Sequence, residues 1–365
     1  MPRLVLLGAG HSHIEVLRRV PALAMRAEIV VVDPHPALPY TGMVPGYVAG
    51  IYGAADVLID VASVCARARA TLRPARAVGI DTASREVRCD DGTIVPYDIL
   101  SIDIGSTLDT SVPGVVEHAL PVRPLWRFMK AWPDAQKRGS RIAVVGAGAG
   151  GIELALAAHA ASAARGGTPQ IAVVGDALRI APGIAPRAQA ELEEACNARN
   201  IGIRLGVRVV RVTRENVVLD DGSCIPADNV LWATGPAPHA WLRTTGLALD
   251  PHGYLAMDRC LRVGGRPDVY AAGDIAGIIG HPRPKSGVYA VREAPVLAEN
   301  LRRALRGESP RAYIPQRRAL ALIGTGDRRA VASYGPLGAE GAWVWRWKDA
   351  IDRRFVQRYR ECRVT

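Results

Sequence analysis

The sequence predicts an α/β protein with two Rossmann-like dinucleotide-binding domains, the first interrupted by the second, and a small C-terminal segment. The main observation is an internal near-repeat: RLVLLGAGHSH at Arg3–His13 is followed by RIAVVGAGAGG at Arg141–Gly151. In both copies a short apolar run ends in a glycine turn and then enters a helical pattern. A second apolar strand follows each copy, so we expect two nucleotide sites, each at a helix N-terminus.

Each copy of the glycine motif is followed, further along the chain, by a second unit, and these two units also resemble one another. The strings REVRCDDGTIVPYDILSIDIGS and ENVVLDDGSCIPADNVLWATG each predict a hairpin with an Asp-Gly turn and then a buried strand. We expect Pro113–Trp132 to be the outgoing linker between the domains and Asp250–Leu261 to be the return. The predicted units are a first dinucleotide-binding domain at 1–120 and 251–312, a second at 121–250, and a C-terminal segment at 313–365.

The first glycine motif, GAGHSH, begins at Gly8 directly after an apolar strand. Gly8 permits the tight turn, and Gly10 lets a pyrophosphate approach the backbone amides. Asp33 ends the next apolar strand, 25 positions after Gly8 (33 − 8), where a carboxylate can accept hydrogen bonds from ribose hydroxyls. The motif and the acidic residue together predict a dinucleotide site.

Two histidines flank Ser12 in this motif. The third position of the pattern, usually glycine, is His13. His11 and His13 could be metal ligands, but we expect no metal. We expect His11 and Ser12 to lie at the start of the helix, beside the ligand.

The second motif has glycine at all three required places, which are Gly146, Gly148 and Gly151. The acidic residue expected at the end of the next strand is displaced by one position, to Asp176, and Arg179 follows closely. A carboxylate here favours NADH, whereas an arginine could accept the additional phosphate of NADPH. The sequence therefore leaves open whether the second site binds NADH or NADPH.

The third element is VYAAGDIA at Val269–Ala276. An apolar strand that ends in Gly273 and Asp274 puts a carboxylate at the carboxyl edge of a sheet, where ligands bind in open α/β folds. The element follows both glycine motifs and a WATG string that ends at Gly235. This order makes it much more specific than an isolated turn.

The order of these elements resembles the pyridine nucleotide-disulfide oxidoreductase superfamily, and within it the type II NADH dehydrogenase branch. The likeness is closest to the flavoprotein found beside, or fused to, selenide, water dikinase, although the dikinase part is absent. The strings that carry it span nearly the whole chain: GAGHSHIEVLRR, PYTGMVPGYVAG, YDILSIDIGS, RPKSGVYAVREAPVLAENLRRAL and WVWRWKDAIDRRF.

The resemblance implies FAD in the first site, with Gly8, Gly10 and Asp33 at the ADP half. Asp274 would hold the ribityl chain. The flavin ring would lie near Thr41, Gly42 and Met43 and near Lys285, one of four lysines in the chain. A lysine there would stabilise negative charge on the reduced ring.

The resemblance also implies NADH or NADPH in the second site, with the three glycines at the pyrophosphate and Glu153 facing the nicotinamide. The implied activity is hydride transfer from nicotinamide to flavin and then to a quinone-like acceptor. Two alternatives stay open. One is a reductase of a selenium or sulfur compound, and the other is a non-catalytic flavin or nucleotide sensor.

Three departures from the superfamily restrict the mechanism. The region that carries a C-x-x-x-x-C pair in disulfide reductases reads YTGMVP here, which excludes that mechanism. The Pro-Lys-x-Gly string of sulfide:quinone oxidoreductases is present, but their flavin-flanking cysteines are not. The glutamines of the type II quinone pocket are replaced by the stretch GVYAVREAP.

Composition sets broader limits. The net charge is +11, almost all from scattered arginines, with no zinc-finger spacing or basic tail, so we expect no nucleic-acid binding. No apolar run approaches the ~20 residues of a membrane span, and the N-terminus reads as a strand rather than a signal peptide. We therefore expect a cytoplasmic protein whose six cysteines are reduced thiols.

The C-terminal string GAWVWRWKDAIDRRFVQRYRE predicts an amphipathic helix. Trp347, Ile351, Phe355 and Tyr359 lie four apart and form one expected stripe, and arginines cover much of the rest. Such a helix fits attachment to the inner, anionic face of a membrane. It also fits packing on the first domain or at a homodimer interface, which we slightly favour because Asp349 and Asp352 interrupt the basic face.

Overall fold

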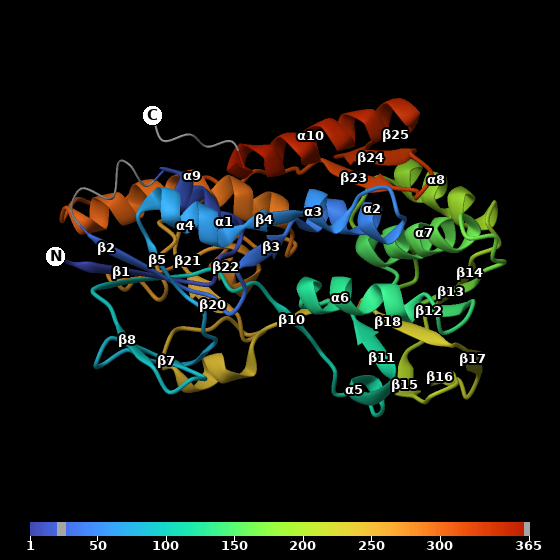
Figure 1. The fold of residues 1–365 in the computed structure, drawn as a ribbon, viewed down its shortest axis with the longest axis horizontal. Coiled ribbons are helices and arrows are strands. Elements are labelled where there is room, and N and C mark those ends of the chain that lie inside the picture. Colours follow the sequence, from blue (N-terminus) through green and yellow to red (C-terminus); the bar gives the residue numbers. More distant parts are fainter. Residues whose placement is uncertain (20–26, 361–365) are drawn as a thin grey trace.

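The computed structural model describes residues 1–19 and 27–360 of the chain. It has two lobes, each built on a five-stranded parallel sheet, and a C-terminal helix that runs along both (Figure 1). This arrangement confirms the predicted α/β class with two Rossmann-like units.

The first sheet has the strand order β21-β9-β1-β2-β5. Its strands are almost continuous apolar runs, because helices and hairpins cover a parallel sheet on both faces. β21 returns to this sheet after the whole second lobe has been formed, so the first unit is discontinuous in sequence. The strands are β1 (Arg3–Leu7), β2 (Glu28–Val32), β5 (Thr71–Arg73), β9 (Ile99–Ile102) and β21 (Val269–Ala271).

The second sheet has the order β11-β18-β12-β13-β14. Its glycine turn leads into α7, a helix rich in alanine whose small side chains allow close packing on the sheet. The strands are β11 (Ala119–Pro121), β12 (Arg141–Val145), β13 (Gln170–Gly175), β14 (Gly202–Leu205) and β18 (Asn229–Trp232).

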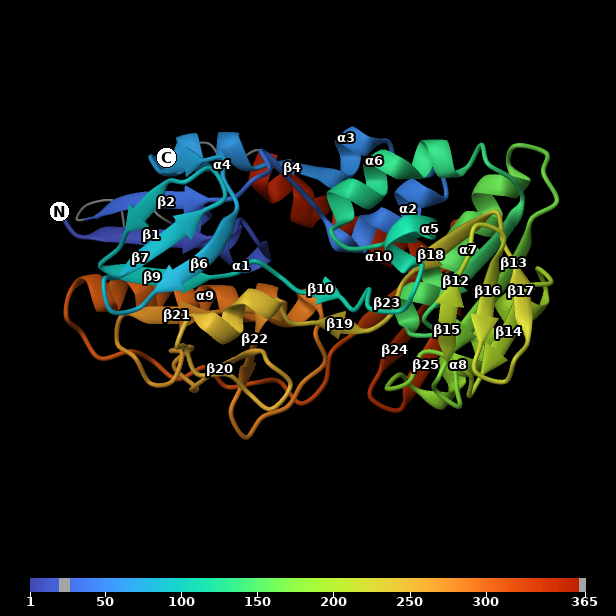
Figure 2. The same ribbon diagram turned by 90° about the horizontal axis from the view of Figure 1, so that it is seen from below.

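The two predicted linkers are wrong in position. Residues 119–121 inside the expected outgoing linker form β11 of the second sheet, and α6 begins at Leu125. The chain crosses between the lobes earlier, at β10 (Thr107–Leu108), which pairs antiparallel with the returning β19 (Pro236–Ala237) (Figure 2). These strands are two residues long, too short for an alternation pattern to be visible in the sequence.

Both predicted hairpins are confirmed, and each gains a third strand. β7 (Glu86–Cys89) and β8 (Ile94–Pro96) join β6 (Ala77–Asp81), while β16 (Asn216–Leu219) and β17 (Cys224–Pro226) join β15 (Val209–Val212). The Asp-Gly turns require left-handed backbone, with φ of +80° at Gly92 and +83° at Gly222.

The C-terminal segment joins the two lobes. Its antiparallel strands β23 (Ala321–Gly324), β24 (Ala330–Tyr334) and β25 (Leu337–Gly341) pack on α7 and α8 of the second lobe. α10 (Ala342–Arg360) then runs back over the first lobe (Figure 1).

The predicted stripe on α10 is wrong as a single face. Phe355 and Tyr359 are buried, whereas Trp347 and Ile351 are 43% and 40% exposed. A spacing of four residues drifts by about 40° per step around a helix with 3.6 residues per turn. Over three steps the stripe passes from the exposed face into the buried one.

The other helices and short strands complete the lobes. The helices are α1 (His11–Arg19), α2 (Val44–Val48), α3 (Ala54–Val57), α4 (Val61–Ala68), α5 (Val115–His118), α6 (Leu125–Ala135), α7 (Ala149–Ala163), α8 (Pro186–Asn197) and α9 (Gly287–Leu305). The 3₁₀ turns are η2 (Thr41–Met43), η3 (Ala240–Thr244) and η4 (Gly273–Ile275), and the remaining strands are β3 (Ala37–Pro39), β4 (Leu58–Asp60), β20 (Leu255–Met257) and β22 (Ala276–Ile278).

Within the described ranges, no helix is both long and apolar enough to cross a membrane.

Candidate active site

The first glycine turn is held against the neighbouring strand β9. Gly8 has a φ of +86°, and a Cβ there would lie 2.5 Å from the carbonyl oxygen of Asp103. Only glycine fits this close approach. The turn therefore leads from β1 into α1 as predicted, at the carboxyl edge of the sheet.

Asp33 fastens this turn to the end of β2. One carboxylate oxygen accepts a hydrogen bond from the amide of Ala9 at 2.8 Å, and the other accepts from the amide of His35 at 2.8 Å. Burial raises the pKa of Asp33 against the lowering effect of these amides. Its oxygens keep further lone pairs, so the predicted role at a ribose remains a proposal.

His11 lies at the start of α1 beside the stacked rings of Tyr40 and Phe355, with centroids 5.7 and 5.8 Å away. Its Nε2 is buried and has no hydrogen-bond partner among the described residues. Burial lowers the pKa of His11 to about 4, so the ring is neutral. An orphaned polar atom beside a glycine motif fits a bound dinucleotide.

The neighbouring side chains have structural partners. The Ser12 hydroxyl donates to the carbonyl of Ala290 in α9 at 2.9 Å. His13 contacts the Gly8 carbonyl through Nδ1 at 2.5 Å and the Ser101 hydroxyl through Nε2 at 2.8 Å. No group of His, Cys, Asp and Glu in the described part of the chain could hold a metal ion.

Asp274 follows β21, at the same edge of the sheet. Its carboxylate forms an ion pair with Arg123 at 2.9 Å, and Arg123 also donates to the Ser106 hydroxyl. Arg123 precedes α6 of the second lobe, so this pair joins the two lobes. Arg123 is not among the site residues that the sequence predicts, because no motif surrounds it.

Lys285 lies close to this edge. Its Nζ donates to the carbonyl of Ala276 at 2.6 Å and lies 3.9 Å from the centroid of the Tyr254 ring. Burial lowers the pKa of Lys285 to about 8, although Asp250 and Asp274 oppose this shift. The ammonium is therefore held at the lobe junction rather than in solvent, and its role at the flavin ring stays a prediction.

Thr41, Gly42 and Met43 form the turn η2, which enters α2. Met43 is buried, and the Thr41 hydroxyl approaches the N-terminus of α9, 3.3 Å from where a Cβ on Gly287 would lie. The carbonyl of Gly42 accepts a hydrogen bond from Lys348 at 2.5 Å. The predicted flavin loop is thus bound by the C-terminal helix.

The second glycine turn is tighter than the first. Cβ atoms would lie 2.2 Å from the Ala233 carbonyl oxygen at Gly146 and 1.8 Å from the Gly146 carbonyl oxygen at Gly151. Gly148 caps α7 and has open space around it, as Gly235 does. The first turn of α7 therefore presents amides that no side chain caps, which suits a phosphate.

The residues beyond this turn are weaker evidence for a nucleotide site than the glycines. Asp176 is exposed, directly after β13. The hydroxyl of Thr234 is buried and has no hydrogen-bond partner among the described residues, a second orphaned group beside a glycine motif. The structure brings Asp176 and Gly235 to the same sheet edge as the glycines, because β13 and β18 both flank β12.

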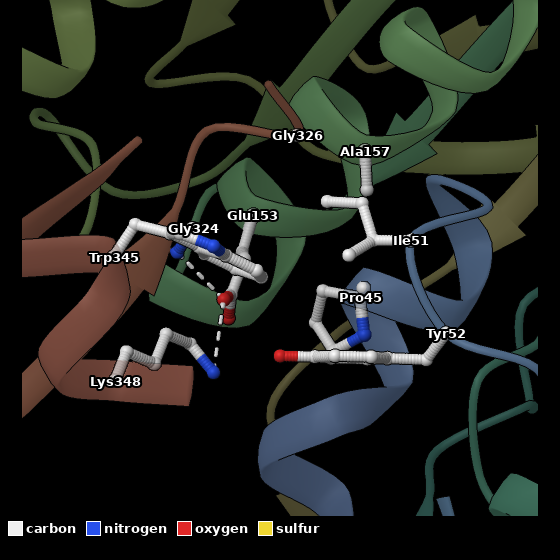
Figure 3. Close-up of a pocket in the computed structure, with 10 residues that line it drawn as sticks. Pro45, Ile51, Tyr52, Glu153, Ala157, Gly324, Gly326, Trp345 and Lys348 are labelled. Carbon is white, nitrogen blue, oxygen red and sulfur yellow. Dashed lines mark hydrogen bonds and ion pairs between the residues drawn. The ribbon is translucent and has the colours of Figure 1, made fainter. Parts of the chain in front are cut away.

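Glu153 projects from α7 toward the C-terminal segment (Figure 3). Its Oε1 accepts a hydrogen bond from the amide of Gly324 at 2.7 Å and lies 4.0 Å from Nζ of Lys348. Burial raises the pKa of Glu153 to about 7, against the lowering effects of Lys348 and the Gly324 amide. The carboxyl is therefore partly protonated at neutral pH.

Lys348 is buried and keeps its charge. It forms an ion pair with Asp352 at 2.7 Å. Burial alone would lower the pKa of Lys348, but Glu153, Asp352 and Asp349 together raise it above its usual value. Lys348 is not among the site residues that the sequence predicts, because a lysine in an arginine-rich helix suggests a solvated face.

These groups line a small pocket where both lobes and the C-terminal segment meet (Figure 3). The rings of Tyr52 and Trp345 lie 6.0 Å apart, at 23° to one another. Its lining residues are Pro45, Gly46, Ile51, Tyr52, Glu153, Ala157, Gly324, Gly326, Trp345 and Lys348.

Replacing Asp274 with alanine should weaken FAD retention by about 10- to 100-fold, because a hydrogen bond to a charged group contributes about 1.5–3 kcal/mol. The measurement is the fluorescence of FAD released when the purified yellow protein is diluted. Asp109→Ala is the control, since Asp109 is bonded to Ser111 within its own turn. A fully flavinated Asp274→Ala protein would contradict the assignment.

Two Rossmann-like units whose glycine turns carry orphaned polar groups, His11 Nε2 and the Thr234 hydroxyl, define the class of two-dinucleotide oxidoreductases. A model of the pyridine nucleotide-disulphide oxidoreductase family matches residues 2–294. The chain belongs to this family, whose members use FAD and NAD(P)H, and its first site fits the flavin nucleotide.

Several known proteins are similar to the chain. An NADH dehydrogenase-like protein of Mycobacterium tuberculosis is 28% identical over 297 residues, covering 76% of this chain and 73% of its own. The demethylphylloquinone reductase NdbB of Synechocystis is 26% identical over 292 residues, covering 75% and 71%. These names agree with the type II branch, which stays a prediction, as does the likeness to the flavoprotein beside selenide, water dikinase.

The fold is also that of solved structures. The sulfide:quinone oxidoreductase of Aquifex aeolicus superimposes with a TM-score of 0.85 at 18% identity, covering 99% of this chain and 92% of its own. NDH2 of Plasmodium falciparum in complex with NADH gives a TM-score of 0.79 at 15% identity, covering 98% of each chain.

Proposed function

We propose that this protein oxidises NADH or NADPH with FAD and passes the electrons to a quinone-like acceptor, without a redox disulfide. The observation that carries this proposal is the pocket around Glu153 and Lys348. The pocket lies between α7, the helix of the second glycine motif, and α10. Lys348 of α10 also binds the predicted flavin loop, at the carbonyl of Gly42. The names of two relatives, a demethylphylloquinone reductase and a plant NAD(P)H-ubiquinone oxidoreductase, support the acceptor class.

The cysteines give no support for a thiol mechanism. Thr41, Gly42 and Met43 occupy the loop where disulfide reductases carry their cysteine pair. The five cysteines among the described residues are all unpaired, and Cys362 lies outside those residues. Burial raises the pKa of Cys65 to about 12 and that of Cys196 to about 11, so neither is a ready nucleophile.

The pocket's near-parallel Tyr52 and Trp345 rings and its apolar walls, Pro45 and Ile51, offer contacts for a planar acceptor with two carbonyl oxygens. With a free volume of about 10 Å³ the pocket has room for about one water molecule, so its walls must move apart before such an acceptor can enter. Glu153 provides a carboxyl that is partly protonated at neutral pH. A quinone needs two electrons and two protons to become a quinol, and Glu153 can donate one of these protons.

Bound FAD would accept a hydride from the nicotinamide and supply electrons to the second substrate. The chain's own residues hold the geometry for this exchange. Lys348 fixes the Gly42 carbonyl and Asp352, so α10 keeps the predicted flavin loop in place. Arg123 and Asp274 hold the second lobe against the first, which sets the approach of the nicotinamide.

The test is anaerobic stopped-flow on the purified yellow protein, mixed first with NADH or NADPH and then with a soluble quinone. We expect fast bleaching followed by fast reoxidation, and the faster nucleotide identifies the preferred donor. Fast bleaching without reoxidation by quinone would overturn the proposal that the acceptor is a quinone. Selenium, sulfur and ferredoxin-type acceptors would then be compared in the same way, and slow bleaching despite tight nucleotide binding would favour a sensor.

We further propose that α10 binds an anionic membrane surface with its exposed face. Trp343, Trp347, Ile351, Arg354 and Arg358 are exposed and share about a quarter of the helix circumference. Aromatic and apolar side chains flanked by arginine are typical of helices that lie in the headgroup region. A lipid-soluble quinone would then be close to the pocket.

Changing Trp343 and Trp347 together to serine should weaken binding to vesicles containing anionic lipid by about tenfold or more, because each exposed indole loses its apolar contact with the lipid. Co-sedimentation measures this, and NADH oxidation with a soluble quinone should be unchanged. Val116→Ser, which removes an exposed apolar side chain from α5 of the second lobe, is the control. Unchanged sedimentation of the double variant would argue for a protein partner or a homodimer on this face.

A further inference from the structure

Asp103 occupies the anion position of the first dinucleotide site. It follows β9 and is 3% exposed. Its Oδ2 accepts hydrogen bonds from the amides of Ser12 at 2.8 Å and His13 at 3.2 Å, in the first turn of α1. A helix N-terminus of this kind is the usual place of a phosphate group, and here a carboxylate of the protein itself is the acceptor.

The glycines of both motif strings pack on this carboxyl. A Cβ on Gly10 would lie 2.4 Å from Oδ2 of Asp103, and a Cβ on Gly273 would lie 2.6 Å from its Oδ1. The space that these glycines leave therefore holds the Asp103 side chain. A pyrophosphate that binds to the remaining amides of the turn must lie directly beside it.

The other carboxylates in this cluster have cationic partners. Asp274 of η4 pairs with Arg123, and Glu293 of α9 pairs with Arg283 and accepts a hydrogen bond from the Gly273 amide at 2.9 Å. Lys285, from the loop before α9, interacts with both of these carboxylates. Asp103 has no ion-pair partner in the described chain, and only backbone amides donate to it.

Of the other titratable groups around Asp103, the two histidines do not change charge near neutrality, whereas Lys285, whose pKa burial lowers to about 8, loses its charge above that pH. Burial lowers the pKa of His11 and of His13 to about 4, so both rings are neutral. Asp103 is thus the unpaired acid of the cluster. Two negative charges a few ångströms apart in a poorly solvated site repel strongly, and the carboxyl can avoid this cost by taking up a proton.

We propose that Asp103 binds a proton when a dinucleotide pyrophosphate enters the first site, which couples FAD occupancy to pH. The inference rests on the dinucleotide-binding role of the first glycine motif. In the absence of FAD, ionised Asp103 caps α1. In its presence, the neutral acid lies beside the pyrophosphate.

The pH range follows from the environment of the acid. Burial, together with Asp274 and Glu293, raises the pKa of Asp103 to about 7 in the free protein, and an adjacent pyrophosphate raises it further. Below pH 6 the acid is protonated in both states, so FAD affinity is independent of this group. Above pH 7 a proton must be taken up on binding, and affinity falls by at most about tenfold per pH unit.

The first experiment measures FAD dissociation from the diluted holoprotein by FAD fluorescence between pH 6 and pH 9. For the wild type, we expect the Kd to rise by about 10- to 100-fold from pH 7 to pH 9. Asp103→Asn keeps an acceptor for both amides but cannot ionise, so its Kd should rise several-fold less than that of the wild type, and an unchanged rise would assign the pH dependence to Lys285, whose pKa is about 8. Asp60→Asn, at the exposed N-cap of α4, is the matched control and should retain the wild-type slope.

If Asp103→Asn folds poorly, a second experiment tests proton uptake on the wild-type protein alone. FAD is titrated by calorimetry into the deflavinated full-length chain at pH 8, in two buffers with different ionisation enthalpies. Uptake of about one proton per FAD supports the proposal. Binding of FAD without proton uptake overturns it and leaves the flavoprotein assignment intact, whereas no FAD binding at any pH would overturn the assignment itself.

Discussion

Replacing Lys348 with methionine should lower the free energy of unfolding by about 3–5 kcal/mol, the usual cost of removing one partner from a buried ion pair. Lys348 is 4% exposed and lies between Asp352 at 2.7 Å and Glu153 at 4.0 Å. Methionine fills a similar volume but leaves two buried carboxyls without a cation. The loss should also release the Gly42 carbonyl, which Lys348 binds.

The pH dependence gives a signature for this change. Without Lys348, burial favours the protonated form of Glu153 more strongly, so its folded-state pKa exceeds that in the unfolded chain. The variant is therefore least stable at high pH and regains stability as the pH falls through that value.

Urea unfolding at pH 5 and pH 8 measures both effects. Lys130→Met, on the exposed face of α6, is the matched control and should change stability little. Adding Asp352→Asn to Lys348→Met should recover part of the loss. A loss below about 1 kcal/mol at pH 8 would show that solvent reaches this cluster.

Glu153→Gln should slow reoxidation of the reduced protein by quinone by about 10²- to 10⁴-fold, the usual contribution of a positioned general acid. Burial raises the pKa of Glu153 to about 7, so the carboxyl is a proton donor below that pH and loses this capacity above it. The wild-type rate should therefore fall as the pH rises through about 7, and the glutamine variant should show no such step. FAD should stay bound in both proteins.

The two half-reactions distinguish the two roles of Glu153. A proton donor to the acceptor affects reoxidation, whereas the position facing the nicotinamide that the resemblance implies would affect reduction by NAD(P)H. Stopped-flow measures both in one preparation. Glu193→Gln, exposed on α8, controls for the change of charge, and unaltered rates in both half-reactions would remove Glu153 from the chemistry.

The fold could be predicted because its signals are local. Gly8 and Gly146 mark turns in which a Cβ would collide with backbone, and the Asp-Gly turns at Gly92 and Gly222 need positive φ. The apolar runs before Gly8 and Gly146 are β1 and β12, which are buried on both faces of a parallel sheet, so their composition is unambiguous. The lobe connection was missed because the crossing strands β10 and β19 are two residues long.

The polar groups inside the site could be predicted only in part. Asp33 and Asp274 lie at strand ends that a motif identifies. Asp103 lies at a similar strand end, but no dinucleotide motif requires an acid there. Lys348 is buried because its helix closes over two lobes that are distant in sequence, and helical spacing alone cannot distinguish that face from a solvated one.

The discontinuous first sheet has a consequence for synthesis of the chain on the ribosome. The strands of the second sheet all lie between residues 119 and 232, so this sheet can form while translation continues. β9 must wait for its outer neighbour β21, and the carboxyl edge of the first sheet gains Gly273 and Asp274 only then. The nascent chain would therefore carry a formed second sheet before the first sheet was complete, and a nucleotide bound at that edge could protect the first sheet from proteolysis only after residue 274 had been made.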